Sequence, residues 1–204
     1  KLGVGSAKLK QQSGVERSIA GRVLATRRHE PGAAVRLSFA APVTIEFEIA
    51  FVLGRDIDHG FTGDPKSAIA ETRVTFELVM ARFIDRRSVG WPSFAADNSG
   101  FEALIIGERL DQHQIPELLS SLVVSVDGEE KARAAAGDDA TDPYGALTDL
   151  VSIARERKMI LPKGSMISTG SASMPVAVSS PKGDVSASYL GKKLGFSFQA
   201  PKNT

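Results

Sequence analysis

The residues best suited to chemistry are three glutamates in two apolar segments. Glu46 and Glu48 stand two apart in TIEFEIAFVL, and Glu77 lies alone in the later run RVTFELVMARFI. Side chains two apart on a strand project from one face, so the Glu46 and Glu48 carboxylates should start roughly 6 to 7 Å apart. One cation can bridge that distance. Three carboxylates in a chain without Cys favour a hard divalent ion, Mg²⁺ or Mn²⁺, with positions open for water and a chelating substrate.

Each glutamate also has a plainer interpretation. Glu46 and Glu48 fit the solvated face of an antiparallel strand. Glu77 is costly in an apolar strand unless it is paired or bound to a ligand, and an ion pair with Arg73, Arg82 or Lys66 would satisfy it equally well. The histidines are too scattered to form a metal motif.

Two predicted strands position these glutamates. Residues 44–53 are rich in β-branched and aromatic side chains, which is typical of a strand, and residues 73–84 form the second. Between them, we expect a short helix over residues 65–72, capped by Asp64.

The remainder is predicted to be mostly strands with one longer helix. Asp127-Gly128 is a strong hairpin signal between strands at 118–126 and 130–135. Asp142 and Pro143 open a helix that runs to about residue 158. The first forty residues are expected to form loops and short elements, including a helix at 6–12, and the end of the chain to form strands at 165–169, 176–180, 185–190 and 194–199.

Composition excludes several classes of protein. Lys and Arg number 25 against 24 Asp and Glu, so no overall field recruits nucleic acid or anionic lipid, and we expect neither nucleic acid nor membrane partners. The absence of Cys removes thiol catalysis, disulfides and thiolate zinc sites, and it fits a reducing compartment. The start, Lys-Leu-Gly-Val-Gly-Ser, has neither an initiator Met nor a signal-peptide core, so we expect a soluble, cytoplasmic and truncated chain.

Several segments resemble one family. VTIEFEIAFVLGRDI, FELVMARFIDRR, FAADNSGFEALIIG and MISTGSASMPVAVSSPKGDVSASYLGKKLGFSF together resemble the 2-keto-4-pentenoate hydratase and 4-oxalocrotonate decarboxylase branch of the fumarylacetoacetate hydrolase superfamily, and the opening KLGVGSAKLKQQSGV resembles it too. The resemblance implies an α+β, β-rich fold, the mixed β-roll of the fumarylacetoacetate hydrolase C-terminal domain type. It also implies a single catalytic domain over residues 1–204 that lacks the family's N-terminal helical segment.

The resemblance assigns roles to particular residues. It implies Mg²⁺ or Mn²⁺ held by Glu46, Glu48 and Glu77, with Lys1 as the catalytic residue that pairs with a substrate carboxylate or moves a proton. Lys1 could equally be an ordinary surface lysine, and the two loops could be plain Asx and Ser turns. The substrate-binding residues that the resemblance implies are Asn98 and Ser99, after Asp97, and Thr169 and Ser171, in a Thr-Gly-Ser turn.

One departure from the family bears on the reaction. The hydratases carry an acid just before a Gly in this region, whereas this chain reads VERSIAGRV, with Ile19 and Ala20 in those places and Glu16 displaced. If that acid delivers a proton or positions water, hydration should be weakened.

We predict a metal-dependent hydratase, a carbon-oxygen lyase that adds water to a 2-hydroxy-2,4-dienoate and gives a 4-hydroxy-2-oxo acid. The main alternative is a decarboxylase of a 2-oxo-3-enedioate, whose second carboxylate could be bound by Arg55, Arg82, Arg86 or Arg87. An acylpyruvate hydrolase would need a His-Glu pair that we do not find, and a noncatalytic 2-oxo acid or metal-binding homologue stays open. Expected partners are the small 2-oxo or 2-hydroxydienoate acid and either further copies of the chain or a pathway enzyme.

Overall fold

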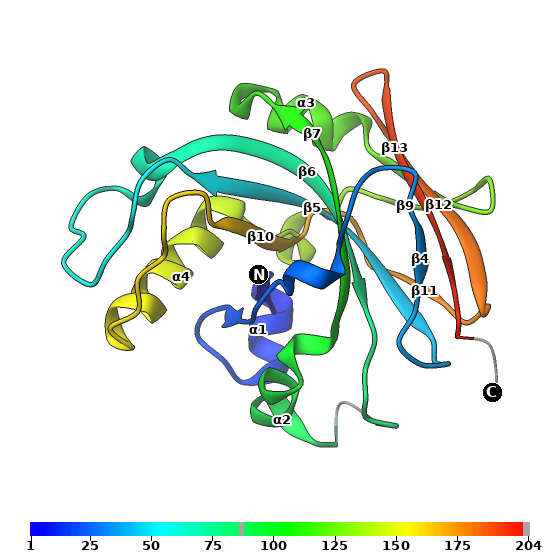
Figure 1. The fold of residues 1–204 in the computed structure, drawn as a ribbon, viewed down its shortest axis with the longest axis horizontal. Coiled ribbons are helices and arrows are strands. Elements are labelled where there is room, and N and C mark those ends of the chain that lie inside the picture. Colours follow the sequence, from blue (N-terminus) through cyan, green and yellow to red (C-terminus); the bar gives the residue numbers. More distant parts are fainter. Residues whose placement is uncertain (86–87, 202–204) are drawn as a thin grey trace.

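Two mixed sheets carry most of the fold (Figure 1). The computed structural model describes residues 1–85 and 88–201. The larger sheet has the order β10-β5-β6-β7-β3, with β11 also pairing with β5, and the second has the order β4-β13-β12-β8-β9. The strands are β1 Leu2–Gly3, β2 Ile19–Ala20, β3 Arg28–His29, β4 Ala34–Arg36, β5 Val43–Leu53, β6 Ile69–Val79, β7 Phe101–Leu110, β8 Val123–Val126, β9 Glu129–Arg133, β10 Met166–Ser171, β11 Val176–Val178, β12 Lys182–Tyr189 and β13 Lys192–Gln199. The helices are α1 Ala7–Ser13, α2 Gly90–Ala96, α3 Ile115–Ser121 and α4 Pro143–Glu156.

The expected α+β, strand-rich class is confirmed. The pairs β3–β7 and β4–β13 are parallel, while the long central pairs β5–β6 and β6–β7 are antiparallel. Strand β5 matches its predicted range to within one residue, because alternating β-branched and aromatic side chains suit a pleated and buried surface.

Aromatic side chains join the two sheets in the core. The rings of Phe47 and Phe76, on β5 and β6, lie 5.3 Å apart in an edge-on arrangement. Phe76 also contacts Phe196 of β13 at 5.3 Å, and Phe47 contacts Tyr189 of β12 at 5.5 Å. These contacts hold one face of β5 and β6 against the second sheet, so the side chains of alternate residues on β5 and β6 face away from it.

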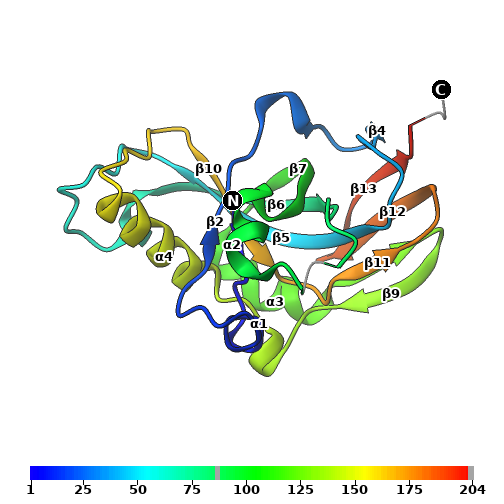
Figure 2. The ribbon, with the colours of Figure 1, turned by 90° about the horizontal axis from the view of Figure 1, so that it is seen from below.

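Short elements gather on that other face. Figure 2 shows α1, α2, α4 and the small β1–β2 pair around the start of the chain. Helix α4 begins at Pro143, as predicted, and the Asp142 carboxylate accepts a hydrogen bond from the backbone N–H of Tyr144 at 3.0 Å. Its apolar stripe, which includes Leu147, Leu150 and Val151, is buried.

Three predicted elements differ most from the structure. The helix expected over 65–72 is a single 3₁₀ turn, Pro65–Ala68, because Ile69 and the residues after it pair with β5 instead. Strand β6 ends at Val79 rather than at residue 84, and Ile84 is fully exposed.

The predicted strand at 118–126 was the third difference. Its first four residues belong to α3, where Pro116 suits the first turn and Ile115 and Leu118 are buried three apart. The hairpin itself is confirmed, because β8 and β9 flank Asp127 and Gly128, whose φ angles of 53° and 81° fit a tight hairpin turn.

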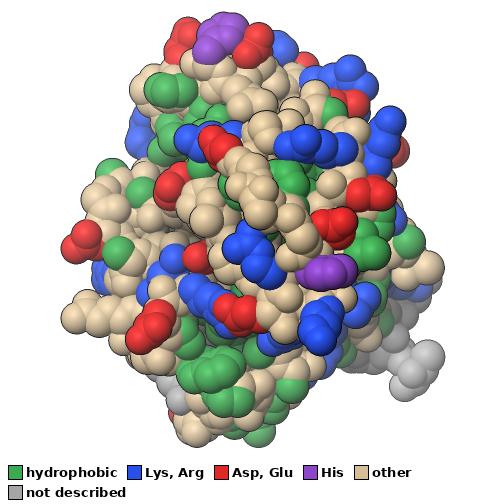
Figure 3. Space-filling view, turned by 90° about the vertical axis from the view of Figure 1, so that its left-hand side faces the viewer, with side chains coloured by type: hydrophobic (Ala, Val, Ile, Leu, Met, Phe, Trp, Pro, Cys, Tyr) green, Lys and Arg blue, Asp and Glu red, His purple; other side chains and the backbone are tan. Residues whose placement is uncertain are grey.

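The surface mixes charges of both signs. On the face shown in Figure 3, basic and acidic side chains are interspersed, as the near-zero net charge leads one to expect. Within residues 1–85 and 88–201, no helix is both long and apolar enough to cross a membrane.

Candidate active site

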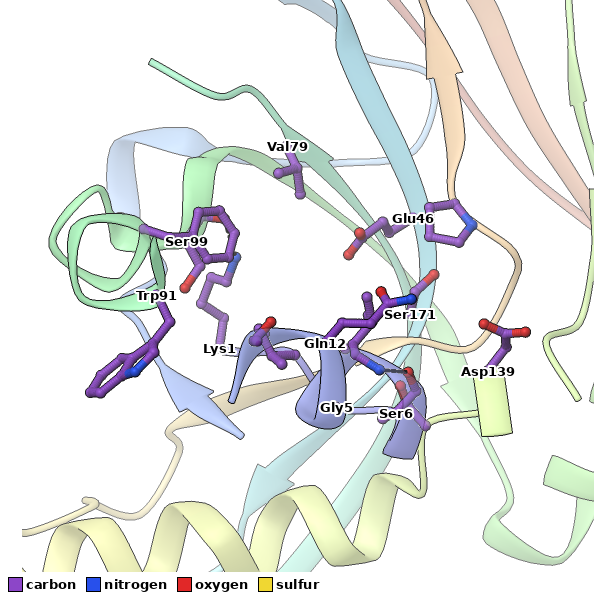
Figure 4. Close-up of a pocket in the computed structure, with 18 of the residues that line it drawn as sticks. Lys1, Gly5, Ser6, Gln12, Glu46, Val79, Trp91, Ser99, Asp139 and Ser171 are labelled. Atoms are coloured by element: carbon purple, nitrogen blue, oxygen red, sulfur yellow. Dashed lines mark hydrogen bonds between the residues drawn. The ribbon is translucent and has the colours of Figure 1, made fainter. Parts of the chain in front are cut away.

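A cavity of about 590 Å³ opens beside the start of the chain (Figure 4). Its wall comes from the first residues through α1, from α2, from Glu46 on β5 and from the segment that follows β10. Figure 4 shows the Glu46 carboxylate pointing inward from the side of the cavity opposite Ser99 and Lys1. Segments that are far apart in sequence therefore enclose one space.

The three predicted glutamates form one cluster at this wall. Glu46 lies directly opposite Glu77 in the β5–β6 register, while Glu48 lies opposite Thr75. Glu48 and Glu77 are completely buried, whereas Glu46 is half-buried and lines the cavity. The solvated-face interpretation is therefore wrong for Glu48.

The carboxylates influence one another electrostatically. Burial, followed by the neighbouring charges of Glu77 and Glu46, raises the pKa of Glu48 well above its usual range. The Ser168 hydroxyl and the Lys1 ammonium act in the opposite direction and do not cancel the effect. Such mutual repulsion is relieved when a cation binds between the carboxylates.

Lys1 is buried against the same cluster. Its Nζ forms an ion pair with Glu77 Oε1, donates to the Ser99 carbonyl at 3.3 Å and lies 5.9 Å from the centre of the Phe101 ring. The surface-lysine interpretation is thus wrong. Lys1 is the one basic residue among the described residues that line the cavity.

The ion pair considered for Glu77 exists, but its partner is Lys1. Arg73 instead pairs with Glu71, Arg82 pairs with Asp97, and Lys66 lies over the Tyr144 ring. The sheet register explains the difference, because alternation along β6 turns Arg73 and Glu77 to the same face but separates them by four residues.

Two carboxylate oxygens in this cluster are orphaned. Glu48 Oε2 accepts a hydrogen bond from Ser168 Oγ, but Glu48 Oε1 is buried without a hydrogen-bond partner, and so is Glu77 Oε2. A buried, unpaired carboxylate oxygen is costly, and a hard divalent cation would satisfy it. The residues present therefore fit such an ion.

The three glutamate side chains do not form a complete set of metal ligands in this structure. In the part of the chain that the structure describes, no three His, Asp or Glu side chains are arranged to hold a metal ion directly. In this arrangement the Lys1 ammonium supplies a positive charge to Glu77, while one oxygen each of Glu48 and Glu77 stays buried without a partner. Metal binding by Glu46, Glu48 and Glu77 stays a prediction.

The two predicted substrate-binding residues in the loop at residues 97–99 lie in different surroundings. Ser99 is buried, lines the cavity and leaves its Oγ without a partner, with φ of 52°. Asn98 instead braces the chain at Arg22, accepting from its N–H at 2.7 Å and donating to its carbonyl at 2.8 Å. Thus Ser99 reaches the cavity and Asn98 supports the loop.

The two predicted substrate-binding residues of the Thr-Gly-Ser turn also differ in whether they line the cavity. Ser171 lines the cavity and donates to the Ser173 carbonyl at 2.7 Å, whereas the Thr169 hydroxyl donates to the Ile49 carbonyl at 2.7 Å and does not line the cavity. Gly170, between them, has a φ of 97°, a backbone conformation that residues with a side chain rarely adopt. At this point the regular register between β10 and β5 is interrupted.

The positions that depart from the family lie off the cavity. Ile19 is buried in β2 and pairs with Gly3, and Ala20 pairs with Leu2. Glu16 is exposed, and none of the three lines the cavity. Arg55 and Arg82 do not line it either, and Arg86 and Arg87 lie outside the described residues.

Several residues of the site were missed from the sequence. Leu9, Trp91 and Met174 give the cavity an apolar, partly exposed wall, and Ser168 contacts Glu48. Thr75 could have been found, because it shares a strand face with Glu77 two residues away. Ser168 had no such signal, since it is brought to Glu48 by the β5–β10 pairing.

Comparison with known proteins identifies relatives. No model of a known protein family matches the chain. A curated 4-oxalocrotonate decarboxylase from Pseudomonas sp is 25% identical over 181 residues, which cover 87% of this chain and 69% of that protein.

Solved structures agree with that match. The 4-oxalocrotonate decarboxylase from Pseudomonas putida G7, complexed with magnesium and adipate, superimposes with a TM-score of 0.80 at 25% identity, covering 98% of this chain and 76% of that one. The same enzyme with calcium and acetate gives 0.79, with the same identity and coverage. A fumarylacetoacetate hydrolase family protein from Yersinia pestis CO92 shares the fold at 14% identity, with a TM-score of 0.62 over 97% of this chain and 90% of that one.

The chain is therefore related to enzymes, and its predicted resemblance to the 2-keto-4-pentenoate hydratase and 4-oxalocrotonate decarboxylase branch of the fumarylacetoacetate hydrolase superfamily is confirmed.

Proposed function

We propose that this protein is a divalent-metal-dependent decarboxylase of a 2-oxo-3-enedioate, a carbon-carbon lyase. The observation that carries the proposal is the pair of orphaned oxygens on Glu48 and Glu77, beside a cavity that Lys1 enters, in a chain similar to 4-oxalocrotonate decarboxylase. That similarity favours the decarboxylase, which the sequence left as the alternative, over the hydratase that it placed first.

The metal would be held by Glu46, Glu48 and Glu77, with Mg²⁺ or Mn²⁺ as the proposed ion. The solved relative's complexes with magnesium and calcium support a divalent ion. When bound, the ion supplies a Lewis acid for the carboxylate and 2-oxygen of a 2-oxo acid.

Lys1 would provide the second positive charge at the substrate. Its ammonium is held by Glu77 and by the Ser99 carbonyl, so it has a fixed position at the cavity wall. In the proposed reaction the bond between the distal carboxyl carbon and its methylene breaks, and carbon dioxide leaves. The electron pair passes through the conjugated double bond to the 2-oxygen, which gains one proton to give a 2-hydroxy-2,4-dienoate. Lys1 would stabilise this developing negative charge or deliver that proton.

The apolar wall suits the departing carboxylate. Leu9, Trp91 and Met174 line the cavity, and among its described lining residues no arginine or histidine is present. These three side chains are partly exposed, so we propose that bound substrate covers them and that the loss of water around its distal carboxylate assists bond breaking. Arg55 and Arg82, two of the four arginines that could have bound the second carboxylate, do not line this cavity.

A direct assay tests the reaction. We expect the chain with Mg²⁺ to release carbon dioxide from 2-oxo-3-hexenedioate, with formation of the dienoate followed by its ultraviolet absorbance, and to lose this activity in EDTA. Hydration of 2-hydroxypenta-2,4-dienoate should be slow, because the chain is similar to a decarboxylase and lacks the acid that the hydratases carry at the positions of Ile19 and Ala20. Efficient hydration without carbon dioxide release would instead support the hydratase.

Assembly and location are further proposals. We propose that the chain acts on a small 2-oxo diacid in the cytoplasm, as a homo-oligomer or together with an enzyme that acts on the same pathway. Sedimentation velocity of the purified chain, alone and with its substrate, measures whether it self-associates.

A further inference from the structure

A buried hydroxyl from a third strand contacts Glu48. Ser168 lies on β10 and is completely buried, and its Oγ donates a hydrogen bond to Glu48 Oε2. The pairing of β10 with β5, in which Ser168 lies opposite Ala50, brings the two side chains together although they are 120 residues apart.

A second buried hydroxyl, that of Thr75, lies next to the Ser168 hydroxyl. Thr75 on β6 lies opposite Glu48 in the register and is also completely buried. Its Oγ1 is 3.5 Å from Ser168 Oγ. Because a hydroxyl has one proton and two lone pairs, a Ser168 that donates to Glu48 can accept from Thr75. Thr75 thus favours the orientation in which Ser168 donates to the carboxylate.

The two oxygens of Glu48 are consequently unequal. Oε2 has its partner in Ser168, whereas Oε1 is buried with none. A half-turn of the carboxylate would exchange two equivalent oxygens and restore the same hydrogen bond, whereas any intermediate rotation would break it. The Ser168 contact therefore fixes the orientation of the carboxylate and the direction in which its unbonded oxygen points.

We propose that Ser168, supported by Thr75, is a positioning residue that holds one oxygen of the Glu48 carboxylate, so that the other oxygen, Oε1 in this structure, is presented to the divalent cation. The inference rests on the metal site of the proposed function and is independent of which reaction the metal serves. It assigns no contact with the substrate to either hydroxyl.

Binding of Mn²⁺ to the full chain, measured by the electron paramagnetic resonance signal of the free ion, tests the proposal without a substrate. Ser168→Ala should raise the Mn²⁺ dissociation constant by roughly 10- to 100-fold, the usual effect of removing a group that orients a metal ligand. Thr75→Val should raise it less, because Ser168 can still donate. Ser168→Cys keeps a similar volume with a weaker donor, so it should also weaken binding if the alanine variant does not fold.

Thr72→Val is the matched control. Thr72 lies on the same strand as Thr75 and is buried, and its Oγ1 has no hydrogen-bond partner among the described residues. Its substitution also removes a buried hydroxyl but no contact with Glu48, so the Mn²⁺ dissociation constant should not change.

The outcomes separate this inference from the proposed function. If the unmodified chain binds Mn²⁺ and Glu48→Gln weakens that binding, but Ser168→Ala leaves the dissociation constant unchanged, the positioning role is overturned and the metal site stands. If Ser168→Ala melts at a lower temperature in EDTA but binds Mn²⁺ with an unchanged dissociation constant, the positioning role is also overturned. The Ser168 hydroxyl would then contribute only to stability. If the unmodified chain does not bind Mn²⁺, the proposed metal-dependent function falls as well.

Discussion

Two buried glutamates on the larger sheet have opposite surroundings. Glu102, at the start of β7, has its Oε1 in an ion pair with Arg27 and also accepts hydrogen bonds from the Ser38 N–H at 2.7 Å and hydroxyl at 2.9 Å. Its Oε2 lies 4.0 Å from the Arg82 guanidinium. Glu48, on β5, has one neutral donor, two negative neighbours and an oxygen without a partner.

The difference separates a structural carboxylate from one kept for a ligand. Glu102 ties β7 to residues 27 and 38, so its partners are supplied by the chain and its burial is compensated. The burial of Glu48 is not compensated in this way, and an unsatisfied buried polar group costs about 1–3 kcal/mol of stability. Such local conflicts are concentrated at functional sites, and this one adjoins the cavity. Between these two carboxylates, burial alone therefore does not mark the site, whereas incomplete pairing of the buried acidic group does.

The largest expected effect comes from neutralising Glu48. Glu48→Gln should reduce the rate of decarboxylation by roughly 10²–10³-fold or more, the scale of losing one group that stabilises developing charge. In EDTA the same variant should melt higher than the unmodified chain, because a buried charge next to Glu46 and Glu77 has been removed. Steady-state assays with Mg²⁺ and thermal melts in EDTA measure both effects.

The activity and the melting temperature of Glu48→Gln together test the contrast between Glu48 and Glu102. Loss of activity accompanied by a lower melting temperature in EDTA would show that Glu48 is a structural residue like Glu102, and the contrast between them would be broken.

Glu102→Gln should give the reverse pattern. It removes the charge that faces Arg27, which should cost about 2–3 kcal/mol of unfolding free energy and about 4–12 °C of melting temperature. The affinity for Mn²⁺ should not change, because Glu102 does not line the cavity. Urea unfolding and Mn²⁺ titration check this, and weakened metal binding without destabilisation would contradict it.

The pH dependence of stability provides a smaller effect. The pKa of Glu48 in the folded protein is raised above its ordinary value of 4.5, so the folded state binds more protons than the unfolded state at pH values between the two. The stability that the protonated form contributes is present below the ordinary pKa and is lost as the pH rises through the folded pKa. In EDTA, the unfolding free energy should therefore decrease as the pH rises from the ordinary pKa of 4.5 through the folded pKa.

Glu48→Gln isolates that contribution, because it has no proton to lose. Its unfolding free energy in EDTA should decline less over the same pH range than that of the unmodified chain. Parallel curves for the two proteins would indicate that Glu48 does not titrate with a raised pKa.

The smallest effect is expected at Asp149, a partly exposed carboxylate on α4. Burial tends to raise its pKa, but the Ser18 N–H at 2.8 Å and the Lys10 ammonium at 3.1 Å lower it below the ordinary value of 3.8. Its stabilisation is therefore present above that value and is lost as the pH falls through the folded pKa.

Asp149→Asn should cost about 0.5–1 kcal/mol at neutral pH, since solvent screens the pair with Lys10. The difference from the unmodified chain, measured by urea unfolding, should shrink as the pH falls below the ordinary pKa of 3.8 and through the folded pKa. A difference that persists at low pH would indicate lost packing rather than lost charge.

The sequence by itself determined the class of fold and the residue types at the site. Local patterns found β5, the hairpin at Asp127-Gly128 and the start of α4, because alternation, turn chemistry and helix capping act over a few residues. The spacing of Glu46 and Glu48 on β5, and the isolation of Glu77 in an apolar run, were legible for the same reason.

Tertiary structure alone decided how those residues are paired. Lys1 meets Glu77 across 76 residues and Ser168 meets Glu48 across 120, through strand register that no local pattern encodes. The same register turned residues 69–72 into strand rather than helix, since pairing with β5 outweighs weak local propensity. Which buried carboxylate is satisfied and which is left for a cation thus depends on neighbours from distant strands, because electrostatic and hydrogen-bond partners are fixed only when the sheet closes.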